Sequence, residues 1–205
     1  MKRSLFFIVI AAFSCMDKPS SGDLVKDMVV QTNYDNTISF SAFSTYALPP
    51  DTIGLVSNTS DASAIVNNYS KAIVSAVKKN FDSQGFQRVE LNQDPDFGVN
   101  IFVVNDLSVF QSVVYPNYYY GYPGYGYGSY YGYGGYYNYP YVNTQVYNQA
   151  ILVIEFADLN TIENGNARVV WTANIGDLIT SVDQDVKVLE AINQAFVQSP
   201  YLKKQ

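Results

Sequence analysis

An amphipathic stripe in the first half of the chain constrains its fold more than any other feature. Apolar residues recur there at every fourth position, at Ile65, Tyr69, Ile73, Val77 and Phe81. Only an α-helix, with about 3.6 residues per turn, places such positions on one face. Ser60 or Asp61 offers an N-cap for this helix, and Gly85 can take the left-handed conformation that ends it. A helix with one apolar face must bury that face against another element.

A second stripe of the same kind closes the chain. Its apolar positions are Val186, Leu189, Ile192 and Phe196. We expect Asp183 to cap this helix and Pro200 to end it, because proline lacks the amide hydrogen that a helix needs. The chain therefore supplies two one-sided helices for the same core.

Many of the other apolar residues alternate with polar ones, a pattern typical of half-buried strands. The predicted strands are residues 28–34, 37–48, 86–91, 97–109, 150–158 and 168–175. Segment 97–109 has apolar side chains on both faces, which indicates a central position. Asn164-Gly165 is a strong turn signal and predicts an antiparallel hairpin between the last two strands. Residues 51–59 are expected to form a polar loop.

Two such helices and these strands can bury each other only as two layers. We therefore predict an α+β fold, a two-layer sandwich in which a mostly antiparallel sheet of about five strands is packed by two amphipathic helices. A chain of 205 residues is long enough for one sizeable core. Residues 28–205 are accordingly expected to form a single domain.

A segment rich in Tyr and Gly, residues 115–141, interrupts the predicted sheet. Fourteen of its 27 residues are Tyr and seven are Gly, and no charged residue lies between Asp106 and Glu155. The segment has no hydrophobic periodicity, so we interpret it as a loop insertion. Such an insertion costs little, because loop-closure entropy grows slowly with length.

Three interpretations of this segment stay open. It can be a tolerated insertion without a role, an adhesive surface, or a contact with lipid headgroups. Tyr has a flat apolar face and a polar tip, which suits stacking on sugars or on a partner protein, and it also favours the membrane interface. The candidate binding residues are Tyr118, Tyr119, Tyr120, Tyr125, Tyr130, Tyr131, Tyr136 and Tyr137.

The N-terminus has the pattern of a secretory signal. Lys2 and Arg3 precede an apolar run over residues 5–13. This run is too short to span a bilayer, which needs about 20 residues. Ala12-Phe13-Ser14-Cys15 resembles a bacterial lipobox, in which the Cys sulfur receives a diacylglycerol, and the alternative is an ordinary cleaved signal.

Lipidation would divide the chain into three parts. We expect a signal peptide over residues 1–14, a flexible tether over residues 15–27 that starts at lipidated Cys15, and the domain that follows. One acyl chain binds a membrane only marginally, whereas a diacylglycerol, with or without a further palmitate, holds a protein durably.

Charge and composition exclude several partners and chemistries. Removing Lys2 and Arg3 from the 12 basic residues leaves 10 against 18 acidic ones, a net charge of −8. We expect no nucleic-acid partner, because that affinity comes largely from basic groups. Anionic lipid heads also repel such a body, so the acyl chains must hold the attachment.

The inventory of reactive side chains predicts a protein without catalysis. The chain has no His and one Cys, so imidazole-based triads and imidazole or thiolate metal sites are excluded. The remaining carboxylate pairs, Asp94 with Asp96 and Asp183 with Asp185, fit a proline turn and a helix N-terminus. We expect no catalytic residues, no metal and no cofactor.

Short motifs along the domain resemble one family. Residues 40–49, Phe-Ser-Ala-Phe-Ser-Thr-Tyr-Ala-Leu-Pro, are similar to the opening motif of the lipoprotein family called domain of unknown function 4136. The later motifs of that family fall at Pro95-Asp96-Phe97, at Val170-Trp171, and at Ala191-Ile192, Phe196 and Pro200. The chain departs from the motif at Phe43 and Ser44, where Tyr-Lys is more usual, and at Leu48, where the family often has Trp.

The resemblance covers about residues 29–203 and implies a Gram-negative envelope lipoprotein with an α/β sandwich, often with a Tyr/Gly-rich insertion at this location. It supplies no catalytic residues. We expect a lipid-anchored protein of the bacterial cell envelope, at the outer membrane facing the periplasm, that binds or scaffolds an unidentified envelope protein or glycan. The alternative is a carbohydrate- or peptidoglycan-binding module that uses the Tyr-rich segment.

Overall fold

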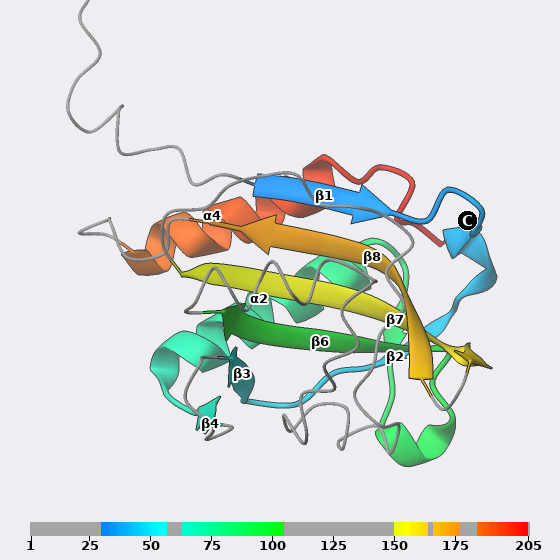
Figure 1. Ribbon diagram of the computed structural model, residues 1–205, viewed down its shortest axis with the longest axis horizontal. Coiled ribbons are helices and arrows are strands. Elements are labelled where there is room, and N and C mark those ends of the chain that lie inside the picture. Colours follow the sequence, from blue (N-terminus) through cyan, green and yellow to red (C-terminus); the bar gives the residue numbers. More distant parts are fainter. Residues whose placement is uncertain (1–29, 57–62, 105–149, 164–165, 177–183, 205) are drawn as a thin grey trace, which may run out of the picture.

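The chain folds into two layers, a mixed sheet and a pair of helices (Figure 1). The computed structural model describes residues 30–56, 63–104, 150–163, 166–176 and 184–204. The strands among them are β1 (Val30–Tyr34), β2 (Thr45–Ala47), β3 (Ile53–Val56), β4 (Ser63–Ile65), β5 (Gln87–Arg88), β6 (Phe97–Val104), β7 (Ile151–Glu163) and β8 (Asn166–Ile175). The α-helices are α2 (Asn68–Ser83) and α4 (Gln184–Val197), and 3-10 turns span Phe40–Ala42 and Leu91–Gln93.

The sheet has the strand order β1-β8-β7-β6-β2-β5. Strands β1, β8, β7 and β6 form three consecutive antiparallel pairs. On the other edge of β6, the short strands β2 and β3 both run parallel to it, β2 beside its start and β3 beside its end. Strand β4 pairs with β3, and β5 pairs with β2.

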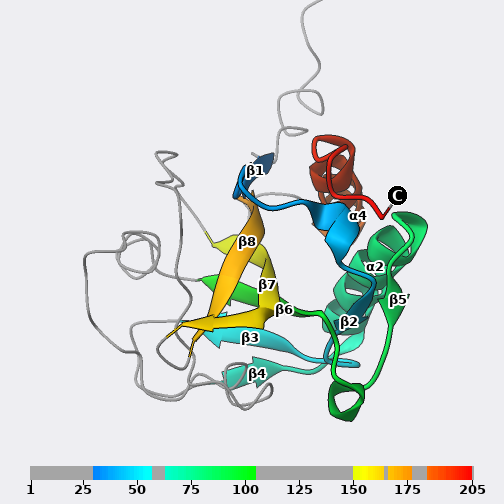
Figure 2. The same cartoon turned by 90° about the vertical axis from the view of Figure 1, so that its right-hand side faces the viewer.

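Both helices cover the same face of the sheet (Figure 2). They are joined to each other by a hydrogen bond from Asn80 Nδ2 to Asn193 Oδ1 of 2.8 Å. The predicted α+β two-layer sandwich with a mostly antiparallel sheet is confirmed. The sheet has eight strands rather than about five, because short strands flank β6 in addition to the long ones.

An aromatic cluster fills the space between the layers. The ring of Phe81, on α2, lies 4.9 Å from that of Phe196 on α4 and 5.6 Å from that of Phe97 on β6. Phe97 in turn stacks on Phe156 of β7 at 3.5 Å. Large aromatic side chains dominate the apolar area that a core removes from water. Phe81, the last position of the predicted helical stripe, therefore contacts both the second helix and the centre of the sheet.

The predicted start of the first helix at Ser60 or Asp61 was wrong. Helix α2 begins at Asn68, and Ile65 belongs to strand β4. Asn67 caps the helix: its Oδ1 accepts from the Ser70 amide at 2.8 Å, and Ser70 Oγ accepts from the Asn67 amide at 2.9 Å. This reciprocal capping box satisfies two amides that would otherwise lack partners, and so fixes the helix start.

The helix end agrees with the prediction. Gly85 has φ of 93°, the left-handed conformation that the sequence predicted for it. The buried stripe positions Ile73, Val77 and Phe81 are likewise confirmed.

The predicted continuous strand over residues 37–48 was wrong as well. It contains a 3-10 turn, Phe40–Ala42, and only the three-residue strand β2. Phe40 and Phe43 both enter the core, and a spacing of three brings side chains to one side of a 3-10 turn rather than of a strand. The predicted polar loop over residues 51–59 contains β3, which finds its partner in distant β6.

The later elements follow the prediction more closely. Strand β6 is central and buried, and β7 and β8 form the predicted antiparallel hairpin. The predicted strand over residues 86–91 shrinks to the two residues of β5, and the turn dipeptide Asn164-Gly165 lies outside the described residues. The last helix ends at Val197, three residues before Pro200. Asp183, its predicted cap, is also outside the described residues.

Candidate functional site

The residues predicted to bind or to carry lipid lie outside the part of the chain that the structure describes. This holds for Cys15 and the tether, and for the whole segment 115–141 with its eight candidate tyrosines. Their predicted roles stay predictions. What the structure does fix is where on the domain the chain enters and leaves these segments.

The Tyr-rich segment is inserted between β6 and β7, which pair along the whole of β6. Strands β6 and β7 form eight consecutive residue pairs, from Phe97 with Asp158 to Val104 with Ile151. Strand β6 ends at Val104 and β7 begins at Ile151, on either side of the residues that are not described. The two attachment points are neighbours, so the insertion leaves the sheet intact, as predicted.

The domain begins at the same end of the sheet. Val30 pairs with Ile175, Ile175 with Leu152, and Leu152 with Val103. These four residues form one row across four strands. The next residue pair of β6 and β7 is Val104 with Ile151. The first residue of β1 and both attachment points of the insertion consequently share one end of the sheet (Figure 1).

A band of buried polar side chains crosses the sheet on the face away from the helices. Asn100, Glu155 and Thr172 are aligned across β6, β7 and β8 and are at most 2% exposed. Asn100 Nδ2 lies 3.3 Å from Glu155 Oε2, and buried Asn174 adds a further amide to the band. Burying such groups is costly unless they are hydrogen-bonded. The bond between Asn100 and Glu155 meets part of this cost inside the sheet.

This band was missed by sequence reasoning. Each strand contributes only one or two polar residues, at positions between apolar ones, and nothing local links them. Only the register of three strands brings Asn100, Glu155 and Thr172 into one row. The available signal was Glu155, a carboxylate inside the otherwise apolar run of residues 150–157.

The carboxylate of Asp96 fixes the segment that contains the opening sequence motif. Its Oδ2 accepts from the amides of Ser44 at 2.7 Å and Thr45 at 2.9 Å, and from Thr45 Oγ1 at 3.1 Å. Burial raises the pKa of Asp96, but the hydrogen bonds from Thr45 and Ser44 outweigh it and hold the pKa below its ordinary value. Asp94, the other member of the predicted pair, is exposed in a left-handed turn conformation.

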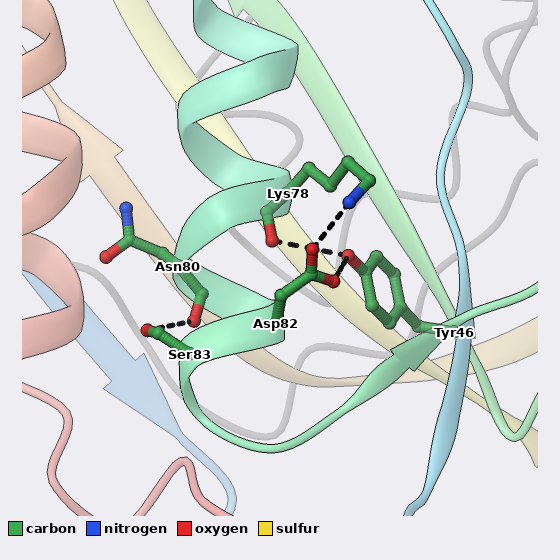
Figure 3. A network of polar contacts seen from close by, with 5 residues as sticks. All are labelled: Tyr46, Lys78, Asn80, Asp82 and Ser83. Atoms are coloured by element: carbon green, nitrogen blue, oxygen red, sulfur yellow. Dashed lines mark hydrogen bonds and ion pairs between the residues drawn. The ribbon is translucent and has the colours of Figure 1, made fainter.

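The motif tyrosine, Tyr46, is fully buried and takes part in a second polar network (Figure 3). Its hydroxyl donates to Asp82 Oδ1 at 2.7 Å, and Lys78 Nζ lies 2.5 Å from Asp82 Oδ2. Burial and then the bond to Asp82 raise the pKa of Tyr46, so its hydroxyl stays protonated. Burial raises the pKa of Asp82, but its bonds to Lys78 and Tyr46 lower it further than burial raises it. The network ties strand β2 to the last turn of α2.

The closing motif is also anchored inside the fold. Trp171 on β8 is fully buried, and its Nε1 donates to Ser199 Oγ at 2.9 Å. Ser199 Oγ also lies 3.3 Å from the hydroxyl of Tyr201, whose ring stacks on Tyr34 of β1 at 3.8 Å. Burial raises the pKa of Tyr201. The chain after α4 is thereby fastened to the sheet.

Asp35 is a further carboxylate whose contacts hold parts of the fold together. Asp35 forms an ion pair with Arg168, and its Oδ1 accepts from Thr37 Oγ1 at 2.6 Å and from the Thr37 amide at 2.9 Å. Burial raises the pKa of Asp35, but the bonds from Thr37 and the charge of Arg168 bring it below its ordinary value.

Within the described ranges, no three acidic, His or Cys side chains are grouped so that they could hold a metal ion. No helix in that part of the chain is long and apolar enough to cross a membrane.

Comparison with known proteins identifies relatives of the whole domain. A family model described as "Domain of unknown function (DUF4136)" matches residues 30–201. A DUF4136 family protein from Bacteroides thetaiotaomicron has a similar crystal structure, with 29% identity, a TM-score of 0.73, and coverage of 87% of this chain and 98% of that one. No curated protein matches.

Two further solved structures resemble the chain less. A PDZ domain protein from Parabacteroides distasonis shares 15% identity with a TM-score of 0.43, over 86% of this chain and 36% of that one. A PelC dodecamer from Paraburkholderia phytofirmans shares 14% identity with a TM-score of 0.39, over 86% of this chain and 98% of that one.

Proposed function

Because the chain belongs to the DUF4136 family, we propose that it is a lipid-anchored envelope protein whose domain binds or scaffolds a partner without catalysis. The observation that carries this proposal is that the side chains of the motif residues contact the domain itself. Thr45, Tyr46, Asp96 and Trp171 all face other parts of the same domain and hold its elements together.

The pKa shifts support a role without acid–base chemistry. A general acid that works near neutral pH needs a carboxyl group with a raised pKa. The carboxyl groups of Asp35, Asp82 and Asp96 all have lowered pKa values, so none of these three is suited to that role. Each remains ionised and accepts hydrogen bonds that stabilise the fold.

The proposed anchor rests on the sequence before the domain. Ala12-Phe13-Ser14-Cys15 has the lipobox pattern, and Cys15 is the only Cys of the chain. Cys15→Ala removes the sulfur that would carry the diacylglycerol, so we expect this variant to move from the membrane fraction to the soluble envelope fraction. Membrane association that is unchanged in Cys15→Ala would exclude the anchor.

The proposed binding role is tested by crosslinking in intact envelopes. Proteins crosslinked to the wild-type chain are compared with those crosslinked to a variant that lacks residues 117–139. Loss of a specific partner with an intact fold assigns the Tyr-rich segment to binding. Loss of binding to isolated peptidoglycan instead would favour the carbohydrate-binding alternative, and retention of every partner would leave the segment without a binding role.

A further inference from the structure

We propose that strand β1 is an interaction surface, and that its partner is the β1 strand of a second copy of this chain. The two strands pair antiparallel about a two-fold axis at Thr32 and join the two sheets into one. This inference goes beyond the proposed envelope role and does not depend on the anchor at Cys15.

Strand β1 lies at one edge of the sheet (Figure 1). Among the strands that the structure describes, it pairs with β8 alone, through five consecutive residue pairs. An edge strand turns a row of backbone N–H and C=O groups away from its own sheet. These groups can pair with a further strand.

The hydrogen bonding at the end of β1 identifies the outward groups. The Asp35 amide donates to the Val170 carbonyl oxygen at 2.9 Å, directly after the last residue pair of β1 and β8. In an antiparallel ladder, alternate residues turn both their N–H and their C=O to the same neighbour. Residues 31 and 33 therefore bond to β8, and the outward groups belong to Val30, Thr32 and Tyr34.

This edge lacks the features that keep natural edge strands apart. Those features are charged side chains, proline and bulges. Val30–Tyr34 contains no charged residue and no proline, and its register with β8 is unbroken. The chain as a whole is acidic, but a two-fold axis through β1 brings no like charges of this strand together.

The strand is complementary to itself in one register. When Thr32 lies opposite Thr32 of the second copy, the outward residues form hydrogen-bonded pairs, and Tyr34 lies opposite Val30 of the second copy. Tyr34 is 41% exposed, although its ring stacks on Tyr201. Cross-strand pairs of an aromatic and a β-branched residue stabilise sheets. The contact therefore covers an exposed apolar side chain of the domain.

The same register matches amide side chains on the other face of the sheet. Gln31 lies opposite Asn33 of the second copy, in the type of pair that brings side chains closest. Asn33 Nδ2 is buried, and no described residue accepts a hydrogen bond from it. Such a donor is costly to leave unsatisfied. The Asn33 residue as a whole is only half-buried, so its amide can turn to the Gln31 oxygen of the second copy.

The association is measured by light scattering and sedimentation of residues 15–205 with Cys15→Ser, a chain that keeps the segment before β1. Two five-residue strands form a small interface, so we expect a weak dimer whose population rises with protein concentration. In Gln31→Lys/Asn33→Lys, a Lys faces a Lys of the second copy at two places. The dimer should then weaken about tenfold or more.

The matched control is Gln31→Glu/Asn33→Lys, which changes the same two positions. It places opposite charges across the axis and should retain the dimer. Urea unfolding followed by the emission of Trp171 checks the fold of both variants. A loss of the dimer that is caused by misfolding is thereby recognised.

The register is tested with Gln31→Cys and Asn33→Cys, made separately in the Cys15→Ser chain. Opposite Cα atoms about 4.5 Å apart can be bridged by a disulfide. A mixture of the two chains should therefore form a mixed disulfide on mild oxidation. Neither chain alone should do so, because identical positions are diagonal neighbours at about 7–8 Å.

A chain that stays monomeric at every concentration would overturn the proposal, whether its edge is left to solvent, to the segment before β1 or to a strand of another protein. Dimers that Gln31→Lys/Asn33→Lys leaves unchanged would place the interface elsewhere and overturn it too. Absence of the mixed disulfide decides against the proposal even if both charged variants lose the dimer.

Discussion

Replacement of Asp96 tests whether the sequence motifs serve the fold. The Asp96 carboxylate accepts three hydrogen bonds from Ser44 and Thr45, residues more than 50 positions away. Asp96→Ala leaves two backbone amides without an acceptor, at about 1–3 kcal/mol each and not fully additive, so we expect a loss of roughly 2–4 kcal/mol. Asp96→Asn keeps an oxygen acceptor but not the charge, and should lose only about 1 kcal/mol.

Urea unfolding followed by the emission of Trp171, the only Trp, measures these losses. With a slope of about 2 kcal/mol per molar urea, Asp96→Ala should lower the midpoint by roughly 1–2 M. The control is Asp94→Asn, at an exposed neighbour whose left-handed conformation Asn tolerates, and it should change stability by less than about 0.5 kcal/mol. Equal stability of Asp96→Ala and wild type would refute the argument.

The same carboxylate predicts a pH dependence. Its pKa in the folded state lies below the ordinary value of 3.8, so its contribution is present above that value and is lost as pH falls through the folded pKa. Between about pH 5 and pH 2 the wild type should therefore lose more stability than Asp96→Asn does. Parallel pH profiles of the two proteins would contradict the assignment.

Three further substitutions probe other contacts, each measured by the same unfolding experiment. Tyr46→Phe keeps the buried ring but removes the bond to Asp82, and because Asp82 can rehydrate we expect a loss of only about 1 kcal/mol; no loss would contradict that bond. Gly85→Ala places a side chain where φ is 93°, and should cost about 1–2 kcal/mol, whereas a gain would exclude the left-handed cap. Ser199→Ala leaves buried Trp171 Nε1 without its acceptor, at about 1–3 kcal/mol, and a neutral result would show that the contact is dispensable.

The helical stripe shows what periodicity can and cannot determine. Spacing of four identifies α2 and its buried face, because that pattern depends on the helix alone. It misplaces the start, since Ser60, Asp61 and Asn67 are all suitable caps. The choice of Asn67 coincides with the pairing of β4 to β3, a tertiary contact that no local pattern encodes.

Short parallel strands and buried polar residues were missed for a related reason. Strand β3 has only four residues and its partner β6 lies more than 40 positions along the chain. The polar band of Asn100, Glu155 and Thr172 exists only in the register of three strands. The sequence placed Asp96 beside a turn proline, whereas in the structure its carboxylate holds Ser44 and Thr45, distant partners that no local motif identifies.

The central claim is that this domain is held at a membrane by lipid on Cys15, and mass spectrometry of the mature protein tests it most directly. The chain is expressed in a Gram-negative host, extracted from the envelope with detergent and digested. We expect an N-terminal peptide that begins at Cys15 and carries a diacylglycerol on its sulfur. A mature chain that begins elsewhere, or that contains Cys15 as an unmodified thiol, would contradict it.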